Sequence, residues 1–455
     1  MKERLLIFKN KDIMRNIFTL AWPTVIQEAL SVCVQYADTA MVGMIGASAS
    51  AAVGLTGSVN WLIGSVCIAF GIGILAVVAK SMGAKNIEKA RKASVQAIYI
   101  TLFIGMIVGI IAYVCSYYLP TWLGADPSIH KEASSYFRIV SLPMVFKAST
   151  LIFGSVLRGA GDSKTPMLVN VLMNLINIIL NFILIYPTRD IMGISVYGAN
   201  LGVNGAAMAT AISLVIGGVL MAIVFFKNKQ LEISKQDLHF HFNDMRESIK
   251  IGVPICMERI VICFGHIFFA SLVSKLGVLS LAAHSIALTA EQAFYIPGYG
   301  MQAAASTLIG NALGEREEKK VKDITFAITF MTFIIMTFLA ILLFIFASQV
   351  MKLFTTDPEV IALGSSILRI VSLSEPLFGI LVILEGVFNG MGDTKAPFIY
   401  SCITMWGIRI LGAICMIQVF HFGIEAVWVM MVLDNVARCL LLGRRFILGK
   451  WKYRL

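Results

Sequence analysis

The sequence predicts an all-α integral membrane protein, in which twelve transmembrane helices form two six-helix bundles related by a pseudo-two-fold axis along the membrane normal. Three observations support this fold class: the apolar composition, the number of long apolar stretches and an internal duplication. Of the 455 residues, 58% are hydrophobic and 14% are charged, and the mean hydropathy is +0.84. A core bounded by water cannot hide this much apolar surface, so much of it must face lipid. This composition excludes a soluble enzyme, a disulfide-rich secreted protein and a disordered chain.

Twelve apolar stretches are long enough to cross a bilayer, which takes about 20 mainly apolar residues for each helix. Charged segments or segments rich in Pro and Gly separate the stretches from one another. The expected spans are 16–40, 52–79, 94–119, 134–157, 167–187, 199–226, 250–274, 279–310, 323–349, 363–388, 398–420 and 424–443.

The basic residues orient these spans. Lys and Arg number 37 against 26 Asp and Glu, a net charge of +11 that alone would suggest a nucleic-acid partner. However, 27 of the 37 fall at the termini and in the loops on one side of the predicted spans, and four fall on the other side. Lys and Arg are enriched in cytoplasmic loops. We therefore expect a multi-pass protein of the cell membrane (inner or plasma membrane), with both termini in the cytoplasm and no nucleic-acid partner.

The two halves of the sequence repeat each other at a fixed offset of 231 residues. The shared register predicts a duplication, with lobes at 1–226 and 250–455 joined by a cytoplasmic linker at 227–249. The matching pairs include Pro23 with Pro254, Gly83 with Gly314, RIVSL at 138–142 with RIVSL at 369–373, and GAGDSKTP at 159–166 with GMGDTKAP at 390–397.

Two halves with an even number of spans enter the membrane in the same direction, as in transporters built from parallel repeats. A cavity between the two bundles could open alternately to each side, which favours a transporter, and a monomer is sufficient for this. The sequence contains no HExxH, GxSxG or phosphate-binding P-loop motif, so we expect no enzyme activity. Its eight cysteines fall in the predicted spans without a CxxC spacing, so we expect inert thiols and no resident metal or cofactor.

One acidic residue and a stripe of asparagines mark the first half. A charge within a span costs about 2.5–3.5 kcal/mol, so Asp38 needs a reason to be there, and its counterpart in the repeat is Phe269. In one interpretation the polar residues form hydrogen bonds between helices. In the other, Asp38 lines a pocket together with Asn177, Asn181 and Thr210. The stripe lies on one face of a helix at 167–187 and consists of Asn170, Asn174, Asn177 and Asn181.

The pocket interpretation gives Asp38 two possible ligands. A carboxylate with amide and hydroxyl oxygens suits a hard cation, which makes Asp38 a candidate Na⁺ ligand. Loss of water around the same carboxyl favours its protonated form, so Asp38 could carry H⁺ instead. In either case the ion is transported and is not a cofactor.

The second half has its own acidic candidates. Glu258 lies one turn after Pro254, and Glu291 lies six residues before Pro297. Proline can open a helix and leave carbonyl groups facing a cavity, so acids beside it are candidates for binding substrate or protons. For Glu258 the alternative is a neutral pair with Arg259.

Aromatic and basic residues add further candidates. Tyr36, Tyr295 and Tyr299 could stack on a planar organic cation, or could simply pack against helices and lipid. Lys147 is expected about 13 Å deep in its span, too far for its ammonium group to reach the surface easily. The sequence does not identify an acid that pairs with it.

Five segments of the sequence resemble signature stretches of the multidrug and toxic compound extrusion (MATE) family. The similarity covers essentially the whole chain, and the length, the number of spans and the repeat agree with it. The resemblance implies cation-coupled antiport by alternating access, in which H⁺ or Na⁺ enters as an organic, often cationic, drug or toxic compound leaves. The segments are WPTVIQEALSVCVQYADTAMVGMIG (22–46), VLRGAGDSKTP (156–166), GVPICMERI (252–260), LAAHSIALTAEQAFYIPGYG (281–300) and VFNGMGDTKAP (387–397).

The resemblance also implies roles for particular residues. Asp38, in a D-T-x-M-x-G segment, matches the coupling site of the amino-terminal lobe together with Asn177, Asn181 and Thr210. Many relatives have a second Asp where this chain has Asn181, and its absence favours H⁺ over Na⁺. The alternative function is a flippase for lipid-linked precursors, which shares the two-bundle plan. A flippase is expected to present more cations in its cavity, whereas the clearest buried charges here are acidic.

Overall fold

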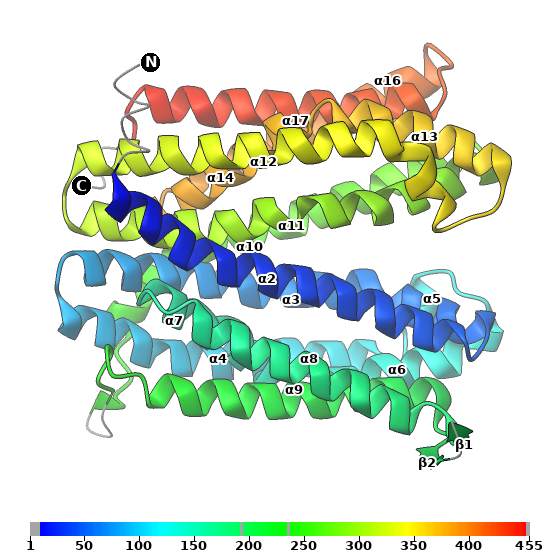
Figure 1. Cartoon of the computed structure of the whole chain (residues 1–455), viewed down its shortest axis with the longest axis horizontal. Coiled ribbons are helices and arrows are strands. Elements are labelled where there is room, and N and C mark those ends of the chain that lie inside the picture. Colours follow the sequence, from blue (N-terminus) through cyan, green and yellow to red (C-terminus); the bar gives the residue numbers. More distant parts are fainter. Residues whose placement is uncertain (1–9, 192–193, 234–236, 452–455) are drawn as a thin grey trace. The chain divides into compact units, whose positions relative to one another are not determined.

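The computed structural model describes residues 10–191, 194–233 and 237–451, and most of them are helical (Figure 1). The elements of the first half are α2 (Lys11–Gly43), α3 (Ala47–Gly83), α4 (Ile87–Cys115), α5 (Leu119–Trp122), the 3-10 helix η2 (Pro127–Ile129), α6 (His130–Ser141), α7 (Met144–Gly159), α8 (Lys164–Leu184), the strands β1 (Pro187–Ile191) and β2 (Ile194–Ala199), and α9 (Gly202–Phe226). Those of the second half are α10 (Phe242–Ser274), α11 (Val278–Gly314), α12 (Glu318–Lys352), α13 (Pro358–Ser372), α14 (Glu375–Met391), α15 (Lys395–Thr404), the π-helix η4 (Met405–Ile410), α16 (Leu411–Gln418) and α17 (Ile424–Ile447).

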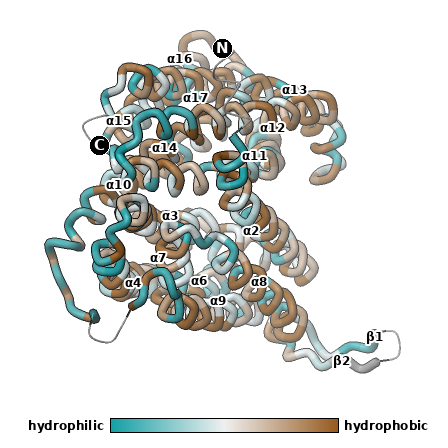
Figure 2. The backbone as a smooth tube through the Cα atoms, turned by 60° about the vertical axis from the view of Figure 1, so that its left-hand side comes forward, coloured by the Kyte–Doolittle hydropathy of each residue, from teal (hydrophilic) through white to brown (hydrophobic). Residues whose placement is uncertain are grey.

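The helices account for the twelve predicted spans. Within the described ranges, nine helices are long and apolar enough to cross a membrane, and two bent helix pairs bring the number to eleven. The twelfth is α11, which carries the buried polar residues His284 and Glu291. Only helices and closed barrels satisfy all backbone groups in lipid, so an all-helical chain of this hydropathy fits a bilayer. Figure 2 shows hydrophobic residues along α8, α9 and α13, and hydrophilic residues in the loop that precedes α10.

The internal repeat is confirmed at the level of helix boundaries. Helix α2 begins and ends 231 residues before α10 begins and ends, and the ends of α3 and α11 have the same offset. So do the starts of α4 and α12 and the starts of α8 and α15. The correspondence is lost after α8, where the first half has an antiparallel hairpin of β1 and β2 that the sequence analysis missed. The second half has η4 and α16 in that region instead.

The predicted spans 134–157 and 363–388 were wrong in one respect, because each is bent and not continuous. Helices α6 and α7 meet at 50°, and α13 and α14 meet at 55°. Pro143 lies at the first bend, and Pro376 is the second residue of α14 at the other. Proline has no backbone N–H and its ring clashes with the carbonyl one turn earlier, which explains why a continuous helix breaks at this place in both halves.

The same Asp-Pro dipeptide, Asp126-Pro127 in the first half and Asp357-Pro358 in the second, begins the first helical segment of each bent span. The Asp126 carboxylate accepts a hydrogen bond from the backbone N–H of Ser128 at 2.8 Å. Asp357 does the same for Glu359 at 2.9 Å. An aspartate before the first helical residue satisfies N–H groups that have no partner within the helix, and a following proline needs none. The repeated motif is therefore a helix start signal.

The described contacts divide the chain into two compact units. The first-half unit comprises Ala29–Val78 and Ile87–Ile249, and within it α7 packs on α4 and α9 while α8 packs on α9. The second-half unit comprises Lys250–Leu455 together with Met1–Glu28 and Ala79–Asn86, and within it α11, α12 and α14 pack on one another. The lobe and linker boundaries inferred from the sequence stay a prediction.

Glycines bring α11 and α14 together inside the second-half unit. A Cβ at Gly390 would lie 2.3 Å from the carbonyl oxygen of Ser306, and one at Gly386 would lie 2.6 Å from that of Gln302. The Ser306 hydroxyl donates across the contact to the carbonyl of Gly386 at 2.9 Å. Small residues are what allow helix backbones to approach this closely within a membrane. This packing holds the acidic and aromatic residues of α11 and α14 in fixed positions.

Candidate functional site

The structure brings together the four polar residues that were predicted to line one pocket in the first half. Asp38 comes from α2, Asn177 and Asn181 from α8, and Thr210 from α9. The Asn181 side-chain nitrogen donates to an Asp38 oxygen at 2.6 Å and to the Asn177 oxygen at 3.2 Å. The Asn177 nitrogen lies 3.4 Å from the Thr210 hydroxyl. We refer to Asp38, Asn177, Asn181 and Thr210 as the Asp38 cluster.

The amide of Asn177 has two hydrogen-bonding orientations. With its nitrogen toward Thr210, its oxygen accepts from Asn181. Turned by 180°, the nitrogen donates to both oxygens of Asp38, at 2.9 and 3.2 Å. An ionised carboxylate accepts N–H donors, whereas a protonated or cation-bound one favours oxygen neighbours. In the second orientation, the amide nitrogens of both Asn177 and Asn181 donate to the Asp38 carboxylate.

One buried atom of the cluster is left unsatisfied. The Asn181 side-chain oxygen is buried and has no hydrogen-bond partner among the described residues. Asn181 is 1% exposed and Asn177 is 5% exposed. A buried acceptor without a donor is costly, and a cation or the proton of a carboxylic acid would satisfy it. The donor set of one carboxylate, amide oxygens and a hydroxyl thus has the chemistry to hold a hard cation or a proton.

Tyr136 is a member of this region that the sequence analysis missed. Its hydroxyl forms a side-chain hydrogen bond with Thr210, and Asp38 lies within electrostatic range of it. Its ring packs beside the small apolar core formed by Val42, Ile185 and neighbouring residues. The repeat offered a signal, because the counterpart of Tyr136 is Ile367, so the hydroxyl belongs to the first half only.

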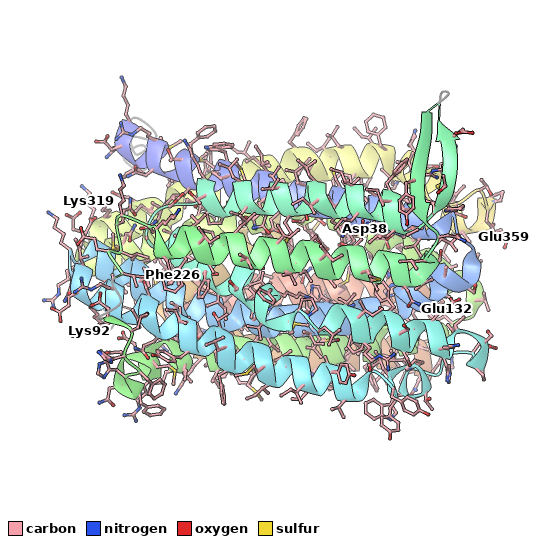
Figure 3. All side chains as sticks on the ribbon, turned by 90° about the horizontal axis from the view of Figure 1, so that it is seen from below. Asp38, Lys92, Glu132, Phe226, Lys319 and Glu359 are labelled. Carbon is pink, nitrogen blue, oxygen red and sulfur yellow. The ribbon has the colours of Figure 1, made fainter. Side chains whose placement is uncertain are left out.

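Asp38 lies away from the ends of its helix bundle. In Figure 3 it lies between the end of the first-half unit that carries Lys92 and the end that carries Glu132, nearer to Glu132. The loop that carries Lys92 is on the basic side of the predicted spans. Asp38 is therefore within the apolar length of the bundle, on the side opposite the basic loops.

Of the substrate-binding candidates, Glu291, Tyr295 and Tyr299 lie together in the second-half unit. The Tyr295 hydroxyl donates to the Glu291 carboxylate. The Tyr295 ring centroid is 4.4 Å from that of Phe378 and 6.3 Å from that of Tyr299. A second buried carboxyl, Glu375, lies within electrostatic range of Glu291, and neither of its oxygens has a hydrogen-bond partner among the described residues. The result is an acidic cluster with aromatic walls.

Glu258 belongs to a different set of contacts from Glu291. Its carboxylate accepts from the Ser401 hydroxyl at 2.6 Å, and the pairing with Arg259 suggested by the sequence is not among its hydrogen bonds or ion pairs in the described residues. It also lies within electrostatic range of Glu385 and Arg438. The structure therefore places Glu258 at the edge of a buried network of charges, and its role in binding substrate stays a prediction.

That network joins α14, α17 and η4. Asp434 forms ion pairs with Arg409 at 2.8 Å and with Arg438 at 3.1 Å. Arg438 lies 3.8 Å from Glu385. Asp434 is fully buried, and both arginines are nearly so. Buried ions persist only when they are paired, so these four residues have to be kept or replaced together.

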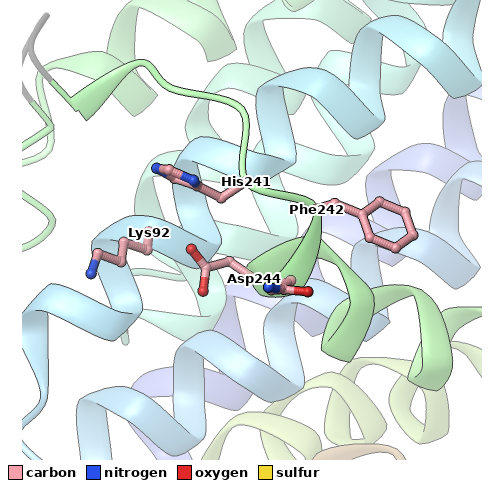
Figure 4. Close-up of a pocket in the computed structure, with 5 residues that line it drawn as sticks. Lys92, His241, Phe242 and Asp244 are labelled. Atoms are coloured by element: carbon pink, nitrogen blue, oxygen red, sulfur yellow. The ribbon is translucent and has the colours of Figure 1, made fainter.

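The remaining substrate candidate is Tyr36, which lies on α2 two residues before Asp38 and is half-buried. Its role also stays a prediction. A pocket of about 330 Å³ lies elsewhere, between the start of α4 and the start of α10, and is lined by Lys92, His241, Phe242, Asn243 and Asp244 (Figure 4). It contains none of the predicted site residues.

Twelve membrane-spanning helices in two repeated halves, with carboxyl groups held inside their apolar length, are the architecture of a polytopic membrane transporter. The MatE family model matches residues 23–183 and 254–415, which are the same part of each half and together more than half of the chain. The chain therefore belongs to the MatE family, the MATE transporters.

Individual relatives agree with this assignment. A probable multidrug resistance protein NorM of Thermotoga maritima is 26% identical over 99% of this chain and 97% of its own length. A probable multidrug resistance protein NorM of Mannheimia succiniciproducens is 25% identical over 96% of this chain and 94% of its own length. A crystal structure of MATE in complex with MaL6 superposes with a TM-score of 0.89, at 23% identity, over the whole of both chains.

Proposed function

We propose that this transporter is an antiporter that exports organic, often cationic, drugs and toxic compounds in exchange for H⁺ or Na⁺ by alternating access. The observation that carries the proposal is the Asp38 cluster, in which a carboxyl lies inside an apolar bundle and is contacted by amide groups of a neighbouring helix. Membership of the MatE family and the names of the multidrug resistance relatives support the organic substrates. Family membership does not favour the lipid-linked precursor flippase.

The coupling step follows from the charge of Asp38. An ion shifts the equilibrium between the outward-facing and inward-facing conformations only if it binds one of them more tightly than the other. An ion with equal affinity for both leaves the equilibrium unchanged. Neutralising a buried carboxylate removes the cost of holding a charge in an apolar span. Binding of H⁺ or Na⁺ at Asp38 therefore changes which conformation is favoured.

The donor set favours H⁺ as the coupling ion. Asp38 is the sole carboxyl of the cluster, and Asn181 occupies the position of the second Asp found in many relatives. Two carboxylates would bind Na⁺ more strongly than one carboxylate with neutral amides. Protonation needs only one carboxyl, and the neutral acid can donate to the Asn181 oxygen, which otherwise has no donor.

The acidic cluster in the second-half unit supports an organic cation as substrate. Glu291 and Glu375 supply negative charge, and Tyr295, Tyr299 and Phe378 supply ring faces. Cations bind over aromatic rings and near carboxylates. The sequence places the basic loops and both termini on one side, so we propose that the protein lies in the inner or plasma membrane with its termini in the cytoplasm.

Reconstituted protein tests this function directly. Purified protein is placed in liposomes with a fluorescent organic cation, and a pH gradient and a Na⁺ gradient are applied separately while ionophores hold the membrane potential at zero. We expect the pH gradient to drive uphill movement of the cation in liposomes with protein and not in empty ones. If neither gradient moves the cation, the proposed exchange is wrong. Movement driven by Na⁺ alone would overturn the preference for H⁺.

A further inference from the structure

Lys147 is a partly buried basic residue that the mechanism above does not use. It lies on α7 in the first-half unit, four residues after the bend at Pro143. Its ammonium group is 3.4 Å from the backbone carbonyl of Asn60, a long contact to an oxygen within a helix. An ammonium group has three donors, so this contact leaves at least two unused. Within the part of the chain that the structure describes, Lys147 forms no ion pair with a carboxylate.

A second unsatisfied group lies beside it. The side-chain oxygen of Asn60 is buried and has no hydrogen-bond partner among the described residues. A Cβ built on Gly64 would lie 3.6 Å from the terminal carbon and the nitrogen of Lys147. Any larger residue at position 64 would therefore cover the ammonium group, whereas glycine leaves it uncovered.

The repeat shows that these three positions form a site in both halves. The counterparts of Asn60, Gly64 and Lys147 are Glu291, Tyr295 and Phe378, in that order. In the second-half unit Tyr295 donates to Glu291 and packs on Phe378, so Tyr295 links the other two counterparts. The same architecture holds an acid and two rings in one half, and an uncovered cation with a neutral amide in the other.

A lone ammonium group in an apolar span is costly, which is why it normally has a partner. An Arg or Lys that merely stabilised the fold would be expected to pair with an acid, as Arg409 and Arg438 do with Asp434. The chemistry that satisfies Lys147 is an anionic group able to accept two or more hydrogen bonds, and a carboxylate is the commonest such group in organic compounds.

We propose that Lys147 binds the carboxylate of zwitterionic substrates. This inference rests on the proposed function, because it assumes that organic compounds are carried, and it assigns the residue that recognises the carboxylate of such a compound. The ammonium group of Lys147 donates to the carboxylate, and a donor on the same compound satisfies the Asn60 oxygen. Compounds that differ only in the carboxylate are then distinguished at this site.

A matched pair of probes tests the inference. Ciprofloxacin is a fluorescent zwitterion, and its methyl ester keeps the ammonium group but has no carboxylate. Transport KM is measured for both compounds in liposomes containing the wild type, Lys147→Met, Lys147→Arg or Lys131→Met, where the exposed Lys131 serves as the control for loss of a positive charge. A hydrogen-bonded charge pair that is lost raises the KM of the acid about tenfold or more.

We expect Lys147→Met to raise the KM of the acid and to leave that of the ester unchanged, which also shows that the variant is folded. Lys147→Arg and Lys131→Met should keep the wild-type ratio of acid to ester. An unchanged ratio in Lys147→Met would overturn the inference while leaving the proposed function intact. If the wild type moved no organic cation, the proposed function would be wrong. Fluorescence polarisation of the acid on purified wild type and Lys147→Met would then test the site alone, and equal affinity would refute it.

Discussion

Replacing Asp434 by asparagine should strongly destabilise the second-half unit. The Asp434 side chain is fully buried and forms ion pairs with Arg409 at 2.8 Å and with Arg438 at 3.1 Å. Asparagine keeps the size of the side chain and removes its charge. Arg409 then loses its ion-pair partner, and Arg438 keeps only Glu385 at 3.8 Å. Removing one partner of a buried ion pair costs about 3–5 kcal/mol, because the other charge stays buried without compensation.

A second substitution separates this effect from simple loss of packing. Arg409→Gln in the Asp434→Asn background removes the extra positive charge and leaves Arg438 with Glu385. The free energy of unfolding of the double variant should therefore exceed that of Asp434→Asn, and the coupling between the two sites should be at least about 1 kcal/mol. Glu88→Gln is the control, because Glu88 forms an exposed ion pair with Lys92 and should change the free energy by less than about 1 kcal/mol.

Unfolding titrations of purified protein in mixed micelles measure these differences. We expect Asp434→Asn to unfold at a much lower denaturant concentration than both the wild type and Glu88→Gln. If Asp434→Asn were as stable as Glu88→Gln, or if the double variant were no more stable than the single one, the charge balance derived from these contacts would be refuted.

Three further substitutions test separate contacts by the same titration. Gly390→Ala should destabilise the protein by about 1–3 kcal/mol, because the new Cβ would overlap the backbone of α11. The control Gly57→Ala has open space around its new Cβ and should be neutral or stabilising. Equal effects of the two substitutions would contradict the close contact between α11 and α14. Ser401→Ala should cost about 1.5–3 kcal/mol by removing the 2.6 Å hydrogen bond to the buried Glu258 carboxylate, and no loss would exclude that bond. The hydroxyl and the backbone N–H of Ser128 donate hydrogen bonds to Asp126 and hold the pKa of its carboxyl below the usual range. The ionised carboxylate therefore stabilises the fold fully above the usual pKa, and this stabilisation is lost as the pH falls through the lowered pKa. The stability of Asp126→Asn should not show this loss at acidic pH, and a pH profile equal to that of the wild type would contradict the interpretation.

Features that depend on composition and local pattern could be predicted from the sequence. The twelve spans and the 231-residue repeat follow from hydropathy and from identical residues in one register, and the structure confirms both. The proximity of Asp38 to Asn177 and Asn181 was predictable because a stripe of polar residues on an apolar helix has to face another polar group. The ion pair of Asp434 with Arg438 lies within one helix at i, i+4, a spacing that favours such a pair.

Features that depend on contacts between distant segments could not be predicted. Arg409 joins Asp434 across two helices, and nothing in the spacing of 25 residues indicates it. The bends at Pro143 and Pro376 were hidden because each lies between two apolar segments, so that hydropathy showed one continuous span. The separation of Glu258 from Glu291 was equally invisible, since both acids lie near a proline in neighbouring helices.

The central claim is that Asp38 couples ion entry to export. The most direct test compares the wild type, Asp38→Asn and Asp12→Asn, which is the same substitution at an exposed position of the same helix. Cells carrying each variant are assayed for the amount of protein in the membrane and for pH-gradient-driven efflux of a toxic fluorescent cation. We predict that Asp38→Asn reaches the membrane in the wild-type amount and exports nothing against a gradient, while Asp12→Asn exports normally. Export by Asp38→Asn at the wild-type rate would contradict the claim.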